Sequence, residues 1–352
     1  MIMKKLVSAQ LVLKTGERFL GYTQSTQTFE VSGEVIFNTG MLGYVESLTD
    51  PSYAGQILCF TYPLIGNYGV SAPTTWESNR IQVKSVVVSE LATFYSNCTS
   101  QHSLLSWFEN ENIPFIAGVD TRALTHCLRE NGVTTGIITQ FNKPQYDFIE
   151  FDAIDWVKQV TIRQPINYGT GRKKVIVVDC GLKENILRCL LKFPIKIKRV
   201  PYDYDYSQEN FDGVFISNGP GDPQLCKKTI TILRKALEKK KPCFGICLGT
   251  QLMALAAGAK TYKLIFGHRS QNQPCVYLPT QRCYLTSQNH GYAVDEKTLP
   301  HHWRVLFRNL NDGTVAGIEH KKAPFFSVQF HPEAAPGPTD TQWLFERFYR
   351  TL

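Results

Sequence analysis

Short apolar runs separated by turn residues dominate the chain from its N-terminus to about Gly136. Such runs are typical of β-strands, and we expect four clear ones, at 9–13, 35–38, 56–60 and 85–88. Two helices are also predicted, one over 102–110 with its cap near Ser100 and one over 121–129 with Asp120 as its N-cap. Residues 1–150 are therefore predicted to form a β-rich domain.

The pattern changes after Lys174, where continuous apolar runs alternate with segments of helical spacing. Strands are predicted at 175–178, 195–200, 213–217, 242–244 and 325–330. Helices are predicted at 183–192 and 248–257. Apolar strands alternating with helices indicate a mostly parallel, doubly wound α/β sheet covered on both faces, here over residues 173–352. The intervening residues 151–172, rich in Pro and Gly, are interpreted as a linker.

Composition and charge narrow the class of protein. A chain of 352 residues favours two domains, and 43% hydrophobic with 19% charged residues is an ordinary globular composition. The net charge of +8 arises in the second half, which carries 26 basic and 15 acidic side chains against 12 and 15 in residues 1–172. We interpret the lysines of 227–241 as a solvated helix face and expect no nucleic-acid partner; an acidic protein partner is the alternative.

The ten cysteines and the hydropathy pattern indicate the kind of cellular compartment in which the protein works. No Cys-x-x-Cys pair and no secretory segment occurs, which favours unpaired thiols in a reducing compartment. The longest uncharged stretch, 242–259, contains polar residues, and we expect no membrane span. The first β-like run begins near Leu6, so we expect no transit peptide and a location in the bacterial cytoplasm, or in the stroma if the gene is plastid-encoded.

The segment Gly245-Ile246-Cys247-Leu248-Gly249 carries the clearest chemical signal. It follows an apolar strand and precedes a predicted helix, so the glycines allow a sharp turn that presents the Cys247 thiol beyond the end of the sheet. A Gly-x-Cys-x-Gly pattern arises by chance only about 0.05 times in such a chain. A helix N-terminus and a nearby imidazolium both favour the thiolate. We expect Cys247 to be a nucleophile and Cys243, on the buried strand, to be inert.

A second strand, 325–330, delivers His331 and Glu333 at its end. Residues two apart in an extended chain point the same way, so the Glu333 carboxylate can reach the edge of the His331 ring that faces away from the thiol. The result is a Cys-His-Glu triad. Spacing alone leaves His290 as a rival base. The oxyanion donors are predicted to be the backbone N–H groups of Leu248 and of Gly219, which lies in a loop after another strand.

Three motifs together resemble the class I glutamine amidotransferases: Ser217-Asn218-Gly219-Pro220-Gly221-Asp222-Pro223, the Cys247 segment, and His331-Pro332-Glu333. The first domain contains segments that look like the small-chain family of carbamoyl-phosphate synthase. These segments are 33–44, 48–53, 61–67 and 118–122. The resemblance covers nearly the whole chain.

The resemblance implies a reaction and a set of roles. It implies that glutamine is hydrolysed through a γ-glutamyl thioester on Cys247, with His331 as base and acid and Glu333 as its orienter. The residues implied to bind glutamine are Ser52, Gly219, Gly221, Leu248, Gln251, Asn289, Gly291 and Tyr292. The implied partner is a large subunit that receives the ammonia and carries ATP and magnesium, while no cofactor or metal is expected in this chain.

Some positions depart from the family's usual pattern, and other functions remain open. Thr250 and Ser270 stand where many relatives have His and Gly, Phe330 where bacterial relatives often have Gly, and Tyr292 where Phe is usual. A stand-alone γ-glutamyl hydrolase or cysteine peptidase is one alternative. A glutamine-sensing module without turnover is another, although the intact triad argues against it.

Overall fold

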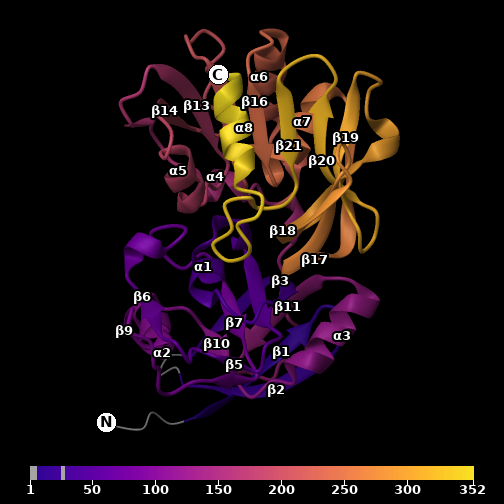
Figure 1. Cartoon of the computed structure of the whole chain (residues 1–352). Helices are drawn as coiled ribbons and strands as arrows, with labels where there is room; N and C mark the ends of the chain where they lie inside the picture. The colour runs from indigo at the N-terminus through magenta and orange to yellow at the C-terminus, as the bar shows by residue number, and fades with distance from the viewer. Residues whose placement is uncertain (1–5, 25–27) are drawn as a thin grey trace. The chain divides into compact units, whose positions relative to one another are not determined.

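The computed structural model describes residues 6–24 and 28–352 of the chain (Figure 1). Contacts divide the chain into two compact units, Met1–Ile154 and Asp155–Leu352. Each unit has its own sheet and its own buried core.

Unit 1 is built on a seven-stranded mixed sheet in the order β10-β7-β4-β3-β11-β1-β2. Its strands are β1 (Val7–Leu13), β2 (Arg18–Thr23), β3 (Glu30–Asn38), β4 (Gln56–Phe60), β7 (Ser85–Val87), β10 (Phe115–Ile116) and β11 (Thr134–Thr139). β3, β4, β7 and β10 run parallel, whereas β11, β1 and β2 extend the sheet by antiparallel pairing. The four predicted strands all occur, so this unit is β-rich as expected.

Within the described residues of unit 1, three α-helices and several short elements accompany the sheet. The helices are α1 (Tyr44–Thr49), α2 (Leu104–Asn110) and α3 (Thr121–Asn131). The short elements are η1 (Pro51–Tyr53), β5 (Leu64–Ile65), β6 (Val70–Ser71), η2 (Pro73–Thr75), β8 (Glu90–Leu91), β9 (Ser100–His102) and η3 (Phe151–Ala153). Apolar side chains of β3, β4, β7, α1 and α2 form a common core.

The two helix caps predicted in this unit had different outcomes. Asp120 caps α3 as expected, because its Oδ1 accepts a hydrogen bond from the Ala123 N–H at 2.9 Å. The cap near Ser100 is wrong. Ser100 lies in β9, and Ser103 caps α2 instead by accepting from the Ser106 N–H at 3.1 Å.

Unit 2 contains a ten-stranded sheet in the order β12-β14-β13-β15-β16-β21-β20-β19-β17-β18. Its strands are β12 (Ile166–Tyr168), β13 (Lys173–Asp179), β14 (Ile195–Pro201), β15 (Gly213–Ile216), β16 (Cys243–Ile246), β17 (Lys260–Tyr277), β18 (Arg282–Asp295), β19 (Trp303–Asn309), β20 (Val315–His320) and β21 (Phe325–Val328). The central five, β14, β13, β15, β16 and β21, are parallel. The α/β prediction is confirmed, and the antiparallel strands are an extension that was not predicted.

Helices cover both faces of the parallel part of this sheet. They are α4 (Val157–Val160), α5 (Glu184–Leu190), α6 (Lys227–Glu238), α7 (Leu248–Ala257) and α8 (Trp343–Thr351), with short turns η4 (Pro223–Leu225) and η5 (Glu296–Thr298). Successive strand residues point to opposite faces. Ile176 and Val178 accordingly pack with α6 and α7, whereas Val175 and Val177 pack with α5 and α8. This arrangement is the doubly wound one expected.

The segment 155–172 belongs to unit 2, although the sequence suggested a linker over 151–172. It supplies α4 and the edge strand β12, which pairs antiparallel with β14 through Asn167 and Lys198. Edge pairing is made by backbone groups, so the polar, Pro- and Gly-rich composition of this segment carried little signal of it.

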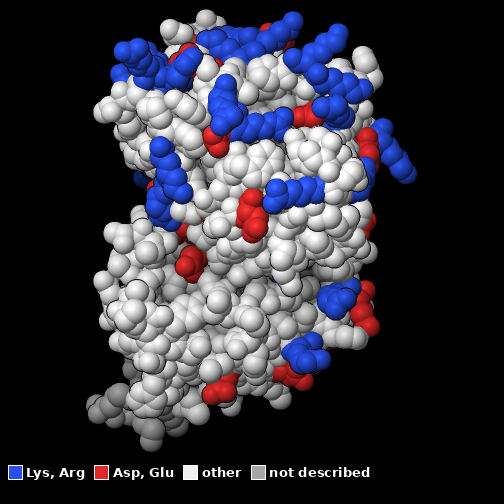
Figure 2. Space-filling model, viewed as in Figure 1, with Lys and Arg blue, Asp and Glu red and all other residues white. Residues whose placement is uncertain are grey.

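The surface of unit 2 is rich in basic side chains, many of which are visible on one face (Figure 2). Lys227, Lys228, Arg234 and Lys235 of α6 are all exposed, whereas Thr229, Ile232, Leu233 and Ala236 of the same helix are buried. The lysines of this region are therefore a solvated helix face, as interpreted from the sequence.

Candidate active site

Cys247 lies at a sharp turn between β16 and α7. Its backbone has φ 53° and ψ −105°, a conformation that costs a non-glycine residue on the order of 1–3 kcal/mol. A Cβ on Gly245 would lie 2.6 Å from the Gly249 carbonyl oxygen, and a Cβ on Gly249 would lie 2.4 Å from that of Ile216. Both flanking glycines are therefore required by close backbone contacts, which explains the Gly-x-Cys-x-Gly pattern.

The Cys247 side chain is at the N-terminus of α7 but is almost fully covered. The residue is 1% exposed, and its Sγ donates a hydrogen bond to the Asn289 carbonyl oxygen at 3.5 Å. The sequence suggested a thiol presented beyond the sheet; the structure differs because β18 packs over it. Attack on a substrate requires the thiol to release this carbonyl.

His331 and Glu333 form a buried ion pair at the end of β21. The His331 Nδ1–H donates to Glu333 Oε1 at 2.6 Å, and the two residues are 2% and 0% exposed. His331 Nε2 has no hydrogen-bond partner among residues 6–24 and 28–352. The ring is thus oriented by the carboxylate and leaves one nitrogen available.

Local charges shift the pKa values of this pair in opposite directions. Burial lowers the pKa of His331, but the charges of Glu333 and Cys247 raise it to about 10. Burial raises the pKa of Glu333, but Lys183 and His331 lower it to about 2. The site therefore stabilises an imidazolium beside the thiol, which is the partner a thiolate needs.

Lys183 is a site residue that the sequence analysis missed. Its Nζ lies 3.0 Å from Glu333 Oε1 and donates to the Ala334 carbonyl oxygen at 2.6 Å, although the residue is only 2% exposed. Lys183 lies just after the carboxyl end of β13. Because sites in parallel sheets form beyond these strand ends, this position was the signal from which Lys183 could have been predicted. Lys183 thus joins Cys247, His331 and Glu333 in a network of four residues. Separately, Asn185 Nδ2 donates a hydrogen bond to the Glu333 backbone carbonyl oxygen at 2.6 Å.

Gly219 and Leu248, the predicted oxyanion donors, lie close together. A Cβ on Gly219 would be 2.7 Å from Leu248 Cδ2 and 2.1 Å from the Cys180 carbonyl oxygen. No side chain fits at Gly219, so the backbone of this loop approaches the elbow closely. Gly221, in the same loop, has φ 81°, a conformation that favours glycine.

The remaining predicted glutamine contacts within unit 2 gather around Gln251 of α7. Its Nε2 donates to the Tyr292 carbonyl oxygen at 2.8 Å and to Gln329 Oε1 at 3.2 Å. Both amide hydrogens are used, so the side chain presents its oxygen as an acceptor. Asn289, Gly291 and Tyr292 lie on β18, and the Asn289 carbonyl oxygen accepts the hydrogen bond from the Cys247 thiol.

Ser52 lies in η1 of unit 1, where its N–H donates to Asp50 Oδ1 at 2.8 Å. It is 7% exposed. Its role in binding glutamine stays a prediction from the resemblance.

His290, the rival base, is occupied elsewhere. Its Nδ1–H donates to the Tyr292 carbonyl oxygen at 2.8 Å, and its Nε2 lies 3.0 Å from Gln288 Oε1. Burial, together with the neighbouring charge of His268, lowers its pKa well below the ordinary value. His331 is therefore the better base.

The departures from the usual pattern are accommodated locally. Phe330 is fully buried with its ring centroid 5.1 Å from that of Phe307. Ser270 Oγ accepts from Gln273 Nε2 at 2.8 Å. Thr250 is buried in the first turn of α7. None of the three replaces a triad residue.

Residues 6–24 and 28–352 contain no group of three or more His, Cys, Asp or Glu side chains placed to hold a metal ion. Within the same ranges, every helix is too short or too polar to traverse a lipid bilayer.

Both units of the chain match models of known protein families. Residues 176–351 match the family described as glutamine amidotransferase class-I, which agrees with the sheet and elbow of unit 2. Residues 11–138 match the carbamoyl-phosphate synthase small chain domain. The chain belongs to the carbamoyl-phosphate synthase small-chain family.

Individual relatives agree over nearly the whole chain. The carbamoyl phosphate synthase arginine-specific small chain of Candida albicans is 46% identical over 371 residues, which cover 99% of this chain and 86% of that protein. The multifunctional protein pyr1-3 of Dictyostelium discoideum is 45% identical, covering 96% of this chain. The multifunctional protein CAD of Squalus acanthias is 46% identical, covering 97%. The chain spans only 16% of each of these two longer proteins.

Proposed function

We propose that this chain hydrolyses glutamine to glutamate and ammonia as the small subunit of a carbamoyl-phosphate synthase. The observation that carries the proposal is the strained Cys247 at the start of α7 beside the His331–Glu333 pair. The partner is a large, ATP- and magnesium-using subunit, which receives the ammonia and makes carbamoyl phosphate for pyrimidine and arginine synthesis. The full-length match to a relative named as an arginine-specific small chain supports this assignment.

The chemistry follows from the positions of these groups. His331 Nε2 holds the proton that the Cys247 thiol has released, and the resulting thiolate attacks the δ-carboxamide carbon of glutamine. The backbone N–H groups of Gly219 and Leu248 stabilise the oxyanion; losing one such donor typically costs about 10²–10³ in rate. As the carbon–nitrogen bond breaks, His331 returns the proton to the leaving nitrogen, which departs as ammonia. His331 then activates water to hydrolyse the γ-glutamyl thioester.

Substrate orientation is assigned to the residues around the thiol. The Gln251 side-chain oxygen is an acceptor and suits the α-ammonium group of glutamine, since its amide hydrogens are committed to Tyr292 and Gln329. Gly221, Asn289 and Gly291 would contribute backbone groups.

The test is Cys247→Ser in the complex with the large subunit. We expect glutamine-dependent synthesis of carbamoyl phosphate to be lost while synthesis from added ammonia is retained. Cys283→Ser is the matched control, because that thiol is exposed and has no part in the proposed reaction. Equal loss with both nitrogen sources would refute the role of Cys247. Full glutamine or peptide hydrolysis by the chain alone would favour a stand-alone hydrolase, and glutamine binding without a trapped thioester would favour a sensing module.

A further inference from the structure

Asp312 lies in the turn between β19 and β20 and contacts a buried histidine. Its Oδ2 accepts a hydrogen bond from the His268 Nε2–H at 2.8 Å. The Asp312 side chain is 36% exposed, whereas that of His268 is 9% exposed. Burial raises the pKa of Asp312, but the His268 contact and the Thr314 N–H lower it to about 2. The carboxylate is thus ionised and orients the His268 ring through the Nε2–H.

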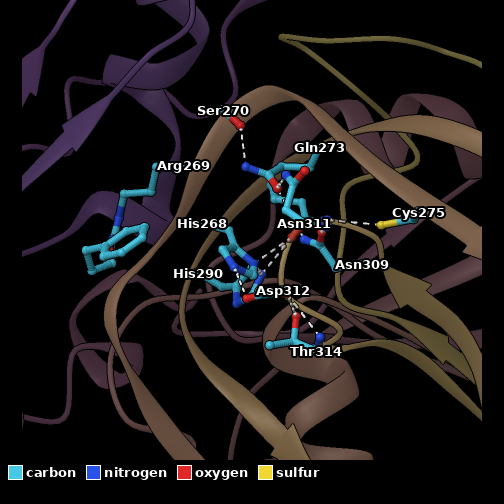
Figure 3. A network of polar contacts seen from close by, with 12 residues as sticks. His268, Arg269, Ser270, Gln273, Cys275, His290, Asn309, Asn311, Asp312 and Thr314 are labelled. Carbon is cyan, nitrogen blue, oxygen red and sulfur yellow. Dashed lines mark hydrogen bonds and ion pairs between the residues drawn. The ribbon is translucent and has the colours of Figure 1, made fainter. Parts of the chain in front are cut away.

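The contacts continue from His268 into β18. Its Nδ1–H faces two acceptors, His290 Nε2 at 3.3 Å and Gln288 Oε1 at 3.1 Å, because the His290 hydrogen is on Nδ1 and Gln288 Oε1 is an amide oxygen. The two imidazole rings are nearly perpendicular at 86° (Figure 3). His290 in turn donates from Nδ1 to the Tyr292 carbonyl oxygen, the atom that also accepts from Gln251 Nε2. An unbroken series of polar contacts therefore joins Asp312 to Gln251.

The backbone of β17 is irregular on both sides of His268. The register with β18 shifts between Lys263 and His268 and again between Ser270 and Gln273. Gly267, inside the first irregularity, has φ 70°, and a Cβ there would lie 2.5 Å from the His290 carbonyl oxygen. Such irregularities re-aim side chains next to functional sites, and this one directs His268 at His290.

We propose that Asp312 and His268 are positioning residues that hold the 288–292 segment of β18 in the geometry needed to bind glutamine. The proposal rests on the function proposed above, because it takes this segment and Gln251 as the glutamine site. Asp312 fixes the orientation of His268, which donates from Nε2 to the carboxylate and from Nδ1 to His290 and Gln288. His290 in turn donates to the Tyr292 carbonyl oxygen. Neither residue touches the substrate.

The first experiment measures glutamine-dependent synthesis by the complex carrying Asp312→Asn. We expect KM for glutamine to rise about tenfold, the change that corresponds to loss of one charge-assisted hydrogen bond of about 1.4 kcal/mol, with kcat unchanged within about twofold. The rate with added ammonia should stay at the wild-type value. Thr314→Val is the matched control, because it removes only the Thr314 hydroxyl bond to Asp312 Oδ1 in the same turn.

The second experiment places variants at His268. An asparagine amide reaches the position of the ring Nδ1 and a glutamine amide that of Nε2, so His268→Asn keeps the inner contacts and His268→Gln keeps the contact with Asp312. Both are expected to raise KM for glutamine. Adding Asp312→Asn to His268→Asn should raise KM no further, because both changes break the same contact.

The outcomes separate positioning from general stability. An unchanged KM in Asp312→Asn overturns the proposal, and so does an equal rise in Thr314→Val or an equal fall in the ammonia-dependent rate. Additive effects in the double variant also overturn it. Failure of the proposed function is distinct, because it would appear as retained glutamine-dependent synthesis in Cys247→Ser.

Discussion

Glu333→Gln tests the charge network most directly, since the substitution keeps the shape and one acceptor oxygen but removes the negative charge. In the wild-type protein the carboxylate faces two cationic groups, with Lys183 Nζ at 3.0 Å and His331 Nδ1 at 2.6 Å. All three side chains are at most 3% exposed. The variant therefore leaves the Lys183 ammonium buried without its counter-charge.

The expected magnitude follows from that uncompensated charge. Removing one partner of a buried ion pair costs about 3–5 kcal/mol, which for a unit of this size corresponds to a fall in Tm of about 6–20 °C. Lys183→Met in the Glu333→Gln background removes the unpaired charge and should recover at least half of the lost stability. Glutaminase activity should not recover, because His331 has lost the charge that favours its protonated form.

The assay combines urea unfolding of the Glu333→Gln, Lys183→Met and double variants with glutamine hydrolysis in the complex. The two stability effects should be strongly non-additive, since the residues share one contact. A Glu333→Gln variant within about 1 kcal/mol of wild type would show that the ion pair is not the source of stability, and the reasoning from burial would be wrong.

Three further predictions follow from the geometry. Gly219→Ala places a Cβ 2.1 Å from the Cys180 carbonyl oxygen; the loop must move, so glutamine-dependent synthesis should fall at least about 10²-fold while ammonia-dependent synthesis persists, and parallel loss of both rates would contradict this. Asp120→Ala removes the N-cap of α3 and should lower the free energy of unfolding, measured in urea, by about 1 kcal/mol. An unchanged urea midpoint would contradict this prediction. The His331 pKa of about 10 lies above its ordinary 6.5, so its charge stabilises the fold below pH 6.5 and this contribution is lost as pH rises through 10; the Tm difference between wild type and His331→Asn should shrink over that range, and a constant difference would contradict it.

Local features of the site were predictable from the sequence. The helix predicted at 248–257 coincides with α7, and the glycines around Cys247 act through contacts within the elbow and with the adjacent strand β15. The His331–Glu333 contact follows from two side chains on one extended segment. Short-range patterns of this kind depend on backbone geometry that neighbouring residues determine.

Other features required contacts between segments far apart in the chain. Lys183 lies 150 positions before Glu333, and no local pattern joins a lysine after β13 to a carboxylate after β21. The long hairpin of β17 and β18 was not predicted, because its apolar positions lose their alternation at two register shifts. The choice between His331 and His290 also depended on which partners each ring meets.

The sequence by itself thus determined the two-unit α/β and β-rich plan, the nucleophile and its elbow, since residue type and spacing along the chain decide these. Only the tertiary structure decided which charges surround Glu333, how β18 covers Cys247, and that Asp312 is linked to Gln251. The physical reason is that electrostatic and hydrogen-bond partners are selected by distance in space, which strand order and register set.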